Sequence, residues 1–97
     1  MVISTLWTKC ALSNLEAELD YYGKISPVLA KELTLTITKS VKNIVNMPGI
    51  GRPGKKIGTR ELVIEQFPYI IAFRVREETL EILALIHQKR KNIRSFY

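Results

Sequence analysis

The fold is decided by residues 60–87, which read RELVIEQFPYIIAFRVREETLEILALIH. Three runs rich in β-branched and aromatic residues stand in this stretch, at residues 60–67, 69–75 and 80–87. Short turn signals separate the runs at Pro68 and at Glu77-Glu78. Because connections this short join neighbouring strands that run in opposite directions, the stretch predicts a three-stranded antiparallel meander.

The segment before the meander, residues 48–58, predicts a loop. Its sequence PGIGRPGKKIG holds four of the chain's five glycines and two of its four prolines, and both residue types interrupt regular structure. Arg52, Lys55 and Lys56 are expected to be exposed on this loop.

The first half of the chain predicts a strand followed by a helical hairpin. Residues 2–7 (VISTLW) are typical of a strand, and Thr8 can cap a helix that Gly23 is expected to end. Ser26-Pro27 is a typical start for a second helix, which should end at Met47-Pro48-Gly49. Apolar residues at helical spacing follow both helices: Leu12, Leu15, Leu19 and Tyr22, then Leu29, Leu33, Ile37, Val41 and Ile44. We therefore predict an α+β fold with both helices packed on one face of the sheet.

Length and composition indicate one small domain spanning residues 1–97. A single cysteine, Cys10, excludes an internal disulfide and fits a reducing compartment. The first residues lack a signal-peptide pattern, and no apolar run approaches the roughly 20 residues of a membrane helix. We therefore expect a cytoplasmic protein without a membrane partner.

Positive charge is concentrated in the second half of the chain. Residues 1–51 carry five lysines and four acids, whereas residues 52–97 carry ten lysines or arginines and five acids, within a net charge of +6. A field of this sign attracts nucleic acid or an acidic protein segment.

Candidate functional residues are the cations of this basic half. They form three groups: Arg52, Lys55 and Lys56 in the loop; Arg60 at the start of a strand; and His87 with Lys89, Arg90, Lys91 and Arg94 at the end of the last strand and in the tail. If the meander brings Arg60 and His87 to one side of the sheet, the cluster would suit phosphate binding or the stabilisation of transition-state charge.

Structural explanations compete with each functional one. The basic loop can be a solvated face that keeps the domain soluble, His87 can be a half-buried strand-end residue, and Arg60 can pair with Glu61 or Glu65. The tail, residues 88–97, can be a disordered solubilising end. Trp7 is expected in the core, and the acids of the first helix, Glu16, Glu18 and Asp20, are expected to be solvated.

Several classes of chemistry find no support in the sequence. There is no phosphate-binding glycine loop, no Ser–His–Asp order, and only one histidine and one cysteine, which stand far apart. We therefore expect no metal and no cofactor. An enzyme built from this chain would depend on cations, His87 and Tyr97, as in metal-free RNA cleavage through the 2′-hydroxyl.

Five short motifs in order resemble the RelE/ParE toxin superfamily over nearly the whole chain. They are Trp7-Thr8 followed by Ala11 and Leu15; residues 48–53 (PGIGRP); residues 58–62 (GTREL); residues 68–75 (PYIIAFRV); and residues 81–83 (EIL) leading to 86–90 (IHQKR). The resemblance implies the toxin of a bacterial type II toxin–antitoxin pair. Such a toxin is held inactive by a co-encoded antitoxin, which usually covers the sheet and the basic face with an acidic segment, in a hetero-oligomer.

The superfamily contains two mechanisms. RelE-like members cleave mRNA on the ribosome and usually carry an arginine two or three residues after the turn into the third strand, where this chain has Ile70 and Ile71. ParE-like, plasmid-stabilising members inhibit DNA gyrase without cleavage, and the Arg-Glu strand start and Tyr-Ile-Ile run favour that branch.

The nuclease alternative adds candidate catalytic residues to a set of binding residues that serves either mechanism. Under the nuclease alternative, Arg60 and Arg90 would hold phosphate, and His87 or Tyr97 would move protons. Under either mechanism, the residues expected to bind the target or the antitoxin are Arg52, Lys55, Lys56, Arg60, Arg74, Lys89, Arg90, Lys91 and Arg94.

Overall fold

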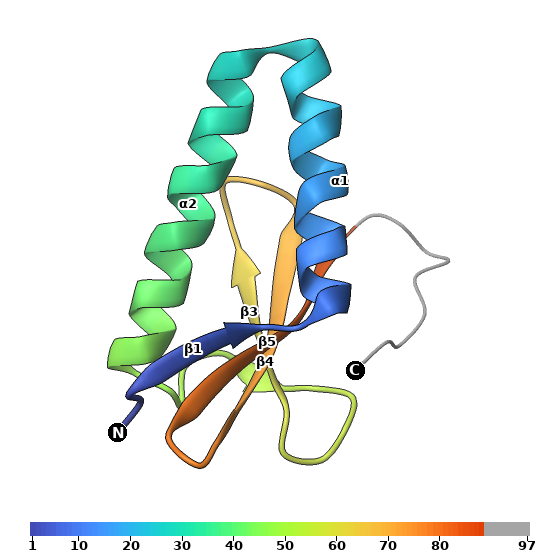
Figure 1. Ribbon diagram of the computed structural model, residues 1–97. Helices are drawn as coiled ribbons and strands as arrows, with labels where there is room; N and C mark the ends of the chain where they lie inside the picture. Colours follow the sequence, from blue (N-terminus) through green and yellow to red (C-terminus); the bar gives the residue numbers. More distant parts are fainter. Residues whose placement is uncertain (89–97) are drawn as a thin grey trace.

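The computed structural model describes residues 1–88 and consists of a helical hairpin over a five-stranded mixed sheet (Figure 1). The elements in chain order are β1 (Ser4–Trp7), α1 (Lys9–Ile25), α2 (Pro27–Asn46), β2 (Arg52–Pro53), β3 (Arg60–Ile64), β4 (Tyr69–Arg76) and β5 (Thr79–His87). The predicted α+β class is confirmed. The predicted tail residues Lys89, Arg90, Lys91, Arg94 and Tyr97 lie outside the described residues.

The two helices are separated by one residue, Ser26. The Ser26 side chain accepts from the Leu29 N–H at 3.4 Å and so caps the start of α2, while its own N–H donates to the Tyr22 carbonyl at 2.7 Å and closes α1. The prediction that Gly23 ends α1 is wrong, because the helix continues to Ile25. Pro27 is the physical reason: a proline forces the preceding residue out of the helical region, and Ser26 is extended, with φ −162° and ψ 121°.

The sheet has the strand order β1-β5-β4-β3-β2. β3, β4 and β5 form the predicted antiparallel meander. β1 joins it as an edge strand parallel to β5, so the sheet is mixed rather than wholly antiparallel. Residues 52 and 53, expected in a loop, form the short strand β2 beside β3.

The turn between β4 and β5 has a special backbone. Glu77 and Glu78 both have positive φ values, 53° and 64°. Two consecutive positive values are typical of the tight turn whose twist matches that of a β-hairpin, although glycine or asparagine usually occupies it. The predicted turn at this position is therefore confirmed, and β4 extends one residue past the predicted end, to Arg76.

A bulge in β5 changes which side chains face the helices. Ala72 pairs with Ala84, but the next residue of β4, Phe73, pairs with Ile82, so Leu83 is an extra residue. The start of α1 bonds the backbone at the bulge and just after it. Thr8 Oγ1 donates to the Leu83 carbonyl at 3.1 Å, and the Leu85 N–H donates to Asn14 Oδ1 at 3.1 Å.

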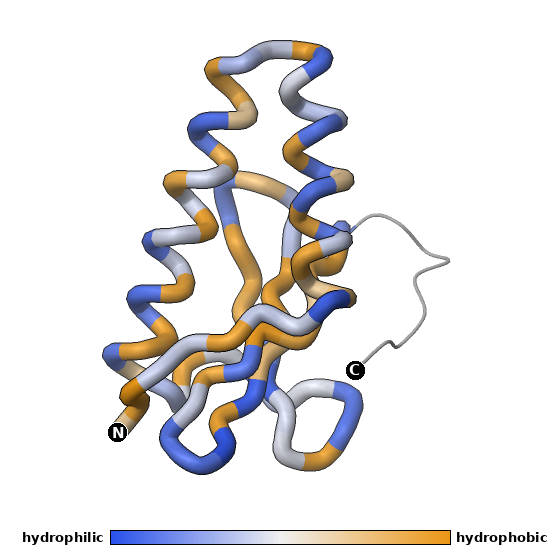
Figure 2. Tube along the Cα trace, viewed as in Figure 1, coloured by the Kyte–Doolittle hydropathy of each residue, from blue (hydrophilic) through white to orange (hydrophobic). Residues whose placement is uncertain are grey.

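The core fills the space between the helices and one face of the sheet, as predicted. Hydrophobic residues gather along this interface (Figure 2). Its fully buried members from α2 and the meander include Leu33, Ile44, Tyr69, Ile71, Phe73, Leu80 and Ile82. The other face of the sheet carries a smaller buried group, formed by Ala72, Leu83 and Ala84.

Candidate functional site

The loop between β2 and β3 presents its lysines on a bonded scaffold. The Gly54 N–H donates to the Thr59 carbonyl at 2.8 Å, and Thr59 Oγ1 donates to the Lys56 carbonyl at 2.6 Å. A Cβ at Gly54 would lie 2.3 Å from Thr59 Oγ1, so only glycine fits there. Lys55 and Lys56 are exposed at the tip, as predicted.

Arg52 lies on the face of the sheet opposite the helices. Its Nε and Nη2 atoms both lie 3.2 Å from Glu61 Oε1, in the neighbouring strand. The carboxylate is nearly buried, with 8% of Glu61 exposed, whereas Arg52 is exposed. The charge of Arg52 is therefore paired within the sheet.

Arg60 supports the chain before β2. Its Nε donates to the Ile50 carbonyl at 3.1 Å and its Nη2 donates to the Gly51 carbonyl at 2.8 Å. Gly51 has a φ of +92°, and a Cβ there would lie 2.4 Å from the Glu61 carbonyl oxygen. Arg60 thus holds a backbone that approaches β3 too closely for any other residue.

Arg74 and Arg76 share one carboxylate on the same open face. Arg74 Nε donates to Glu81 Oε1, and Arg76 Nη2 lies 3.6 Å from Glu81 Oε2. The pairs join adjacent strands, because Arg74 is the register partner of Glu81. Both guanidinium groups therefore stabilise the β4–β5 hairpin.

His87 lies on the helix-facing side of the sheet, at the end of β5. Its ring meets Tyr69 edge to face, with centroids 5.2 Å apart. Uninterrupted alternation would place His87 on the face of Glu81 and Leu83, but the bulge at Leu83 moves Leu85 and His87 to the side of Tyr69.

The structure does not bring Arg60 and His87 together. Arg60 is level with Phe73, and His87 is level with Tyr69, so the two lie four residues apart along β4, which is about 13 Å at the usual strand rise. The reason is directional: β3 and β5 both run antiparallel to β4, so the start of β3 lies beside the start of β5 and not beside its end.

A buried polar pair, Glu18 and Tyr69, lies beside His87. The Tyr69 hydroxyl donates to Glu18 Oε1 at 2.5 Å, and Glu18 is only 6% exposed while Tyr69 is fully buried. Burial, and then the hydrogen bond to Glu18, raise the pKa of Tyr69 above its ordinary value. The expectation that Glu18 is solvated is therefore wrong.

Helical spacing was the signal that would have located Glu18. It follows Leu15 by three residues and precedes Tyr22 by four, so it lies on the apolar stripe that faces the core. Glu16 and Asp20 are exposed, as expected.

No metal site is formed by residues 1–88, which contain no cluster of three side chains able to hold a metal ion. Within the same range, no helix is long and apolar enough to cross a membrane.

Comparison with known proteins gives the family. The family described as the ParE toxin of the type II toxin–antitoxin system parDE matches residues 5–92. This chain belongs to the ParE toxin family.

Individual relatives of this ParE-family chain are also toxins or belong to a toxin–antitoxin system. It is 37% identical over 81 residues to "Putative toxin Y4kP" of Sinorhizobium fredii, covering 84% of this chain and 83% of that protein. It is 32% identical over 85 residues to "Toxin RelE2" of Caulobacter vibrioides, covering 88% and 94%. Among solved structures, a chain of the chromosomal ParDE toxin–antitoxin system from P. aeruginosa superposes with a TM-score of 0.77 at 32% identity, over 89% of this chain and 96% of that one.

The ParE-family chain is thus the toxin of a type II toxin–antitoxin system, as the sequence motifs implied. Membership of such a system implies a cognate antitoxin as its partner. The charged groups on the described surface include the ion pairs of the open face and the exposed lysines of the loop.

Proposed function

We propose that this toxin stops growth by binding DNA gyrase, without cutting nucleic acid. The observation that supports the proposal is that the described arginine side chains already have bonding partners within the protein. Every arginine within residues 1–88 is already bonded to a protein group: Arg52, Arg74 and Arg76 to carboxylates, and Arg60 to two carbonyls. A phosphate-cleaving centre needs cations that are available to the reacting phosphate.

The hydrophobic residues at the start of β4 support the same proposal. Ile70 and Ile71 stand where RelE-like members carry an arginine, and Ile71 is fully buried in the core. A charged side chain in place of Ile71 would require burial of an unpaired cation, which is costly. In β4, the side chain of Ile71 therefore packs in the core at a position where a RelE-like nuclease would carry a cation.

The exposed lysines Lys55 and Lys56 are the described cations best placed to bind a target. The bonded loop holds them away from the sheet, and the positive field of the second half would steer an acidic surface towards them. The other predicted binding residues, Arg52, Arg60 and Arg74, contribute to this field while holding their own structural partners.

A gyrase assay tests the proposal. Purified toxin, gyrase, ATP and relaxed plasmid are mixed, and supercoiling is measured. We expect inhibition by the natural toxin, and inhibition about tenfold weaker with Lys55→Glu/Lys56→Glu, since loss of a charged contact lowers association. The matched control is Lys31→Glu/Lys39→Glu, which makes the same charge change on exposed positions of α2.

A second candidate is mRNA cleavage on the ribosome, which the similarity to "Toxin RelE2" favours. In that mechanism Arg60, His87, Arg90 and Tyr97 are the candidate catalytic residues. The same toxin is added to translating ribosomes, and the mRNA is analysed for cuts. Cut mRNA with unaffected supercoiling would replace the gyrase proposal with this one.

A further inference from the structure

The loop between β2 and β3, residues 54–59, carries a fully exposed apolar side chain. Ile57 is exposed to 105%, whereas the other large apolar residues within residues 1–88, apart from Met1, are exposed to 70% or less. The loop projects from the end of the molecule opposite the tip of the helical hairpin (Figure 1). The Ile57 side chain therefore contributes no apolar burial to the fold of the toxin.

Thr59 closes this loop with three hydrogen bonds. Its carbonyl accepts from the Gly54 N–H at 2.8 Å, and its N–H and Oγ1 both donate to the Lys56 carbonyl, at 3.1 and 2.6 Å. Gly58 has a φ of +87°, which residues with a side chain rarely adopt, and it turns the chain from the exposed tip back to Thr59. The backbone that carries Ile57 is therefore ordered by bonds within the loop.

Two positive charges stand beside this apolar side chain. Lys55 and Lys56 are exposed, and within residues 1–88 neither of them forms an ion pair. The tip of the loop thus combines one apolar group with two uncompensated cations. A partner surface with an apolar depression bordered by carboxylates would match both features.

We propose that Ile57 is the apolar anchor of the contact with gyrase, inserted into an apolar depression bordered by carboxylates, while Lys55 and Lys56 steer the encounter. The inference rests on the proposed function and assigns its contact to one side chain. An anchor gains most when the loop that carries it is already ordered, because less conformational entropy is then lost on binding. The hydrogen bonds of Thr59 meet this condition.

A nucleic acid would fit the tip of the loop less well than a protein surface. The lysines could bind phosphate, but isoleucine offers no hydrogen bond to a base edge and no ring on which a base could stack. Loss of the Ile57 side chain would therefore leave the affinity for a nucleic acid unchanged, whereas it would lower the affinity for an apolar depression of a protein.

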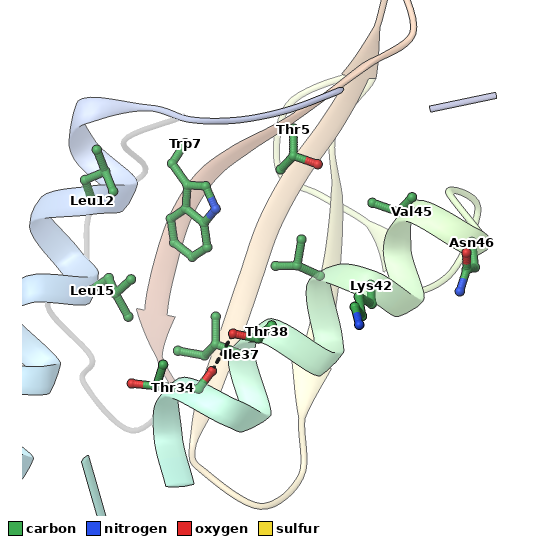
Figure 3. Close-up of a pocket in the computed structure, with 11 residues that line it drawn as sticks. Thr5, Trp7, Leu12, Leu15, Thr34, Ile37, Thr38, Lys42, Val45 and Asn46 are labelled. Carbon is green, nitrogen blue, oxygen red and sulfur yellow. Dashed lines mark hydrogen bonds between the residues drawn. The ribbon is translucent and has the colours of Figure 1, made fainter. Parts of the chain in front are cut away.

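The loop is separate from the apolar groove between the two helices and β1. The indole of Trp7 points into that groove, between Leu15 of α1 and Ile37 of α2 (Figure 3). β1 and β2 are the opposite edges of the sheet, so the groove and the loop lie on different parts of the toxin. Ile57 therefore offers an apolar contact that does not involve the groove.

Binding kinetics separate the roles of the anchor and the lysines. Gyrase is immobilised, and association and dissociation of the natural toxin are compared with those of Ile57→Ser. We expect dissociation to become about tenfold faster or more, because the apolar burial of one isoleucine is lost, and association to change by less than about twofold. For Lys55→Glu/Lys56→Glu we expect slower association that depends less on salt.

The matched control is Ile25→Ser, at the tip of the helical hairpin. Ile25 is the last residue of α1 and is 58% exposed. Its variant should dissociate from gyrase at the natural rate to within about twofold, and urea denaturation shows that both serine variants are folded. Equal dissociation rates for Ile57→Ser and the natural toxin, or an equal rise for both serine variants, would overturn the assignment of Ile57.

A second pair of variants tests the order of the loop. Thr59→Val removes the hydroxyl that donates to the Lys56 carbonyl, and Thr59→Ser keeps it. We expect affinity for gyrase to fall about two- to fivefold for Thr59→Val and to change by less than about twofold for Thr59→Ser. The bonded amide of Gly54 should exchange faster in free Thr59→Val than in Thr59→Ser. Faster exchange with unchanged affinity would contradict the role given to loop order.

These outcomes separate the anchor from the gyrase proposal itself. A natural toxin that does not bind gyrase would overturn both. A natural toxin that inhibits gyrase, with Ile57→Ser inhibiting equally well, would leave the gyrase proposal standing and overturn the anchor. Weaker inhibition by Ile57→Ser, with natural inhibition by Ile25→Ser, would support both.

Discussion

The two faces of the sheet are formed by the same strands but differ in polarity and in exposure. The face under the helices is aliphatic and aromatic, and the carboxylate buried against it, Glu18 of α1, is bonded to Tyr69. The open face carries carboxylates bonded to partly exposed arginines, at Glu61 and Glu81. Stability should therefore come mainly from the helix-facing side, while the open side contributes charge and the pairing of neighbouring strands. This difference can be tested by measuring the free energy of unfolding of single variants.

The largest effect is expected from Leu33→Ala in the helix-facing core. Leu33 is fully buried, so the change removes apolar contacts and leaves a cavity, and should lower the free energy of unfolding by about 2–5 kcal/mol. Urea denaturation measures this. Leu35→Ala, on the same helix at 59% exposure, is the control and should change it by less than about 0.5 kcal/mol.

The buried polar pair gives the next effect. Glu18→Gln removes the charge that accepts the Tyr69 hydroxyl hydrogen bond, and should cost about 1–3 kcal/mol in the free energy of unfolding. Glu16→Gln makes the same change at an exposed site of the same helix. Because a glutamine oxygen can still accept from the Tyr69 hydroxyl, equal small losses for the two variants would show that the buried charge contributes nothing specific.

Alkaline pH should act on the same pair. The pKa of Tyr69 is raised above its ordinary value of 10.0, so the folded protein keeps a proton that the unfolded chain releases. The stabilisation is complete below pH 10.0 and is lost as the pH rises, by about 1 kcal/mol near pH 11. Tyr69→Phe should flatten this part of the pH profile, and an equally steep profile for that variant would assign the slope to other groups.

The smallest effect is expected on the open face. Glu81→Gln weakens the pairs with Arg74 and Arg76, whose side chains are 38% and 61% exposed. Solvent screens such pairs, so the loss should be about 1 kcal/mol or less and should shrink as salt is added. A loss as large as that of Leu33→Ala would remove the proposed division between the two faces.

Local sequence signals predicted most of the fold. Ser26-Pro27 located the hairpin because a cap and a proline act within one turn of helix, and Glu77-Glu78 located a turn between two alternating runs. The same kind of signal failed at Gly23, because an isolated exposed glycine can stay helical when a stronger signal follows. Residues 52 and 53 pair with β3 through close approach at Gly51, and their glycine-rich context indicated only a loop.

Local sequence signals could not predict the contacts between residues that lie far apart in the chain, either in the fold or in the candidate site. The bulge at Leu83 determines the face of His87. It is bonded by Thr8, the N-cap residue of α1, and by Asn14 within α1, about 70 residues earlier in the chain. The parallel pairing of β1 with β5 likewise depends on where the hairpin returns the chain. Lys55 and Lys56 were predicted correctly as exposed loop residues, and Arg60 and Arg74 as strand residues. The carboxylate and carbonyl partners of the arginines depend on strand register, which composition does not specify.

The extra residue in β5 also limits how the chain can change in length. Deletion of Leu83 would remove the bulge and leave residues 84–87 on their present faces, because Ile82 already pairs with Phe73 and Ala84 with Ala72. A residue inserted between Ala84 and Leu85 would instead turn the rest of the strand over and move Leu85 out of the core, so it would act like several simultaneous substitutions. The same change near exposed Ile57, at the tip of the lysine loop, would alter only the reach of that loop.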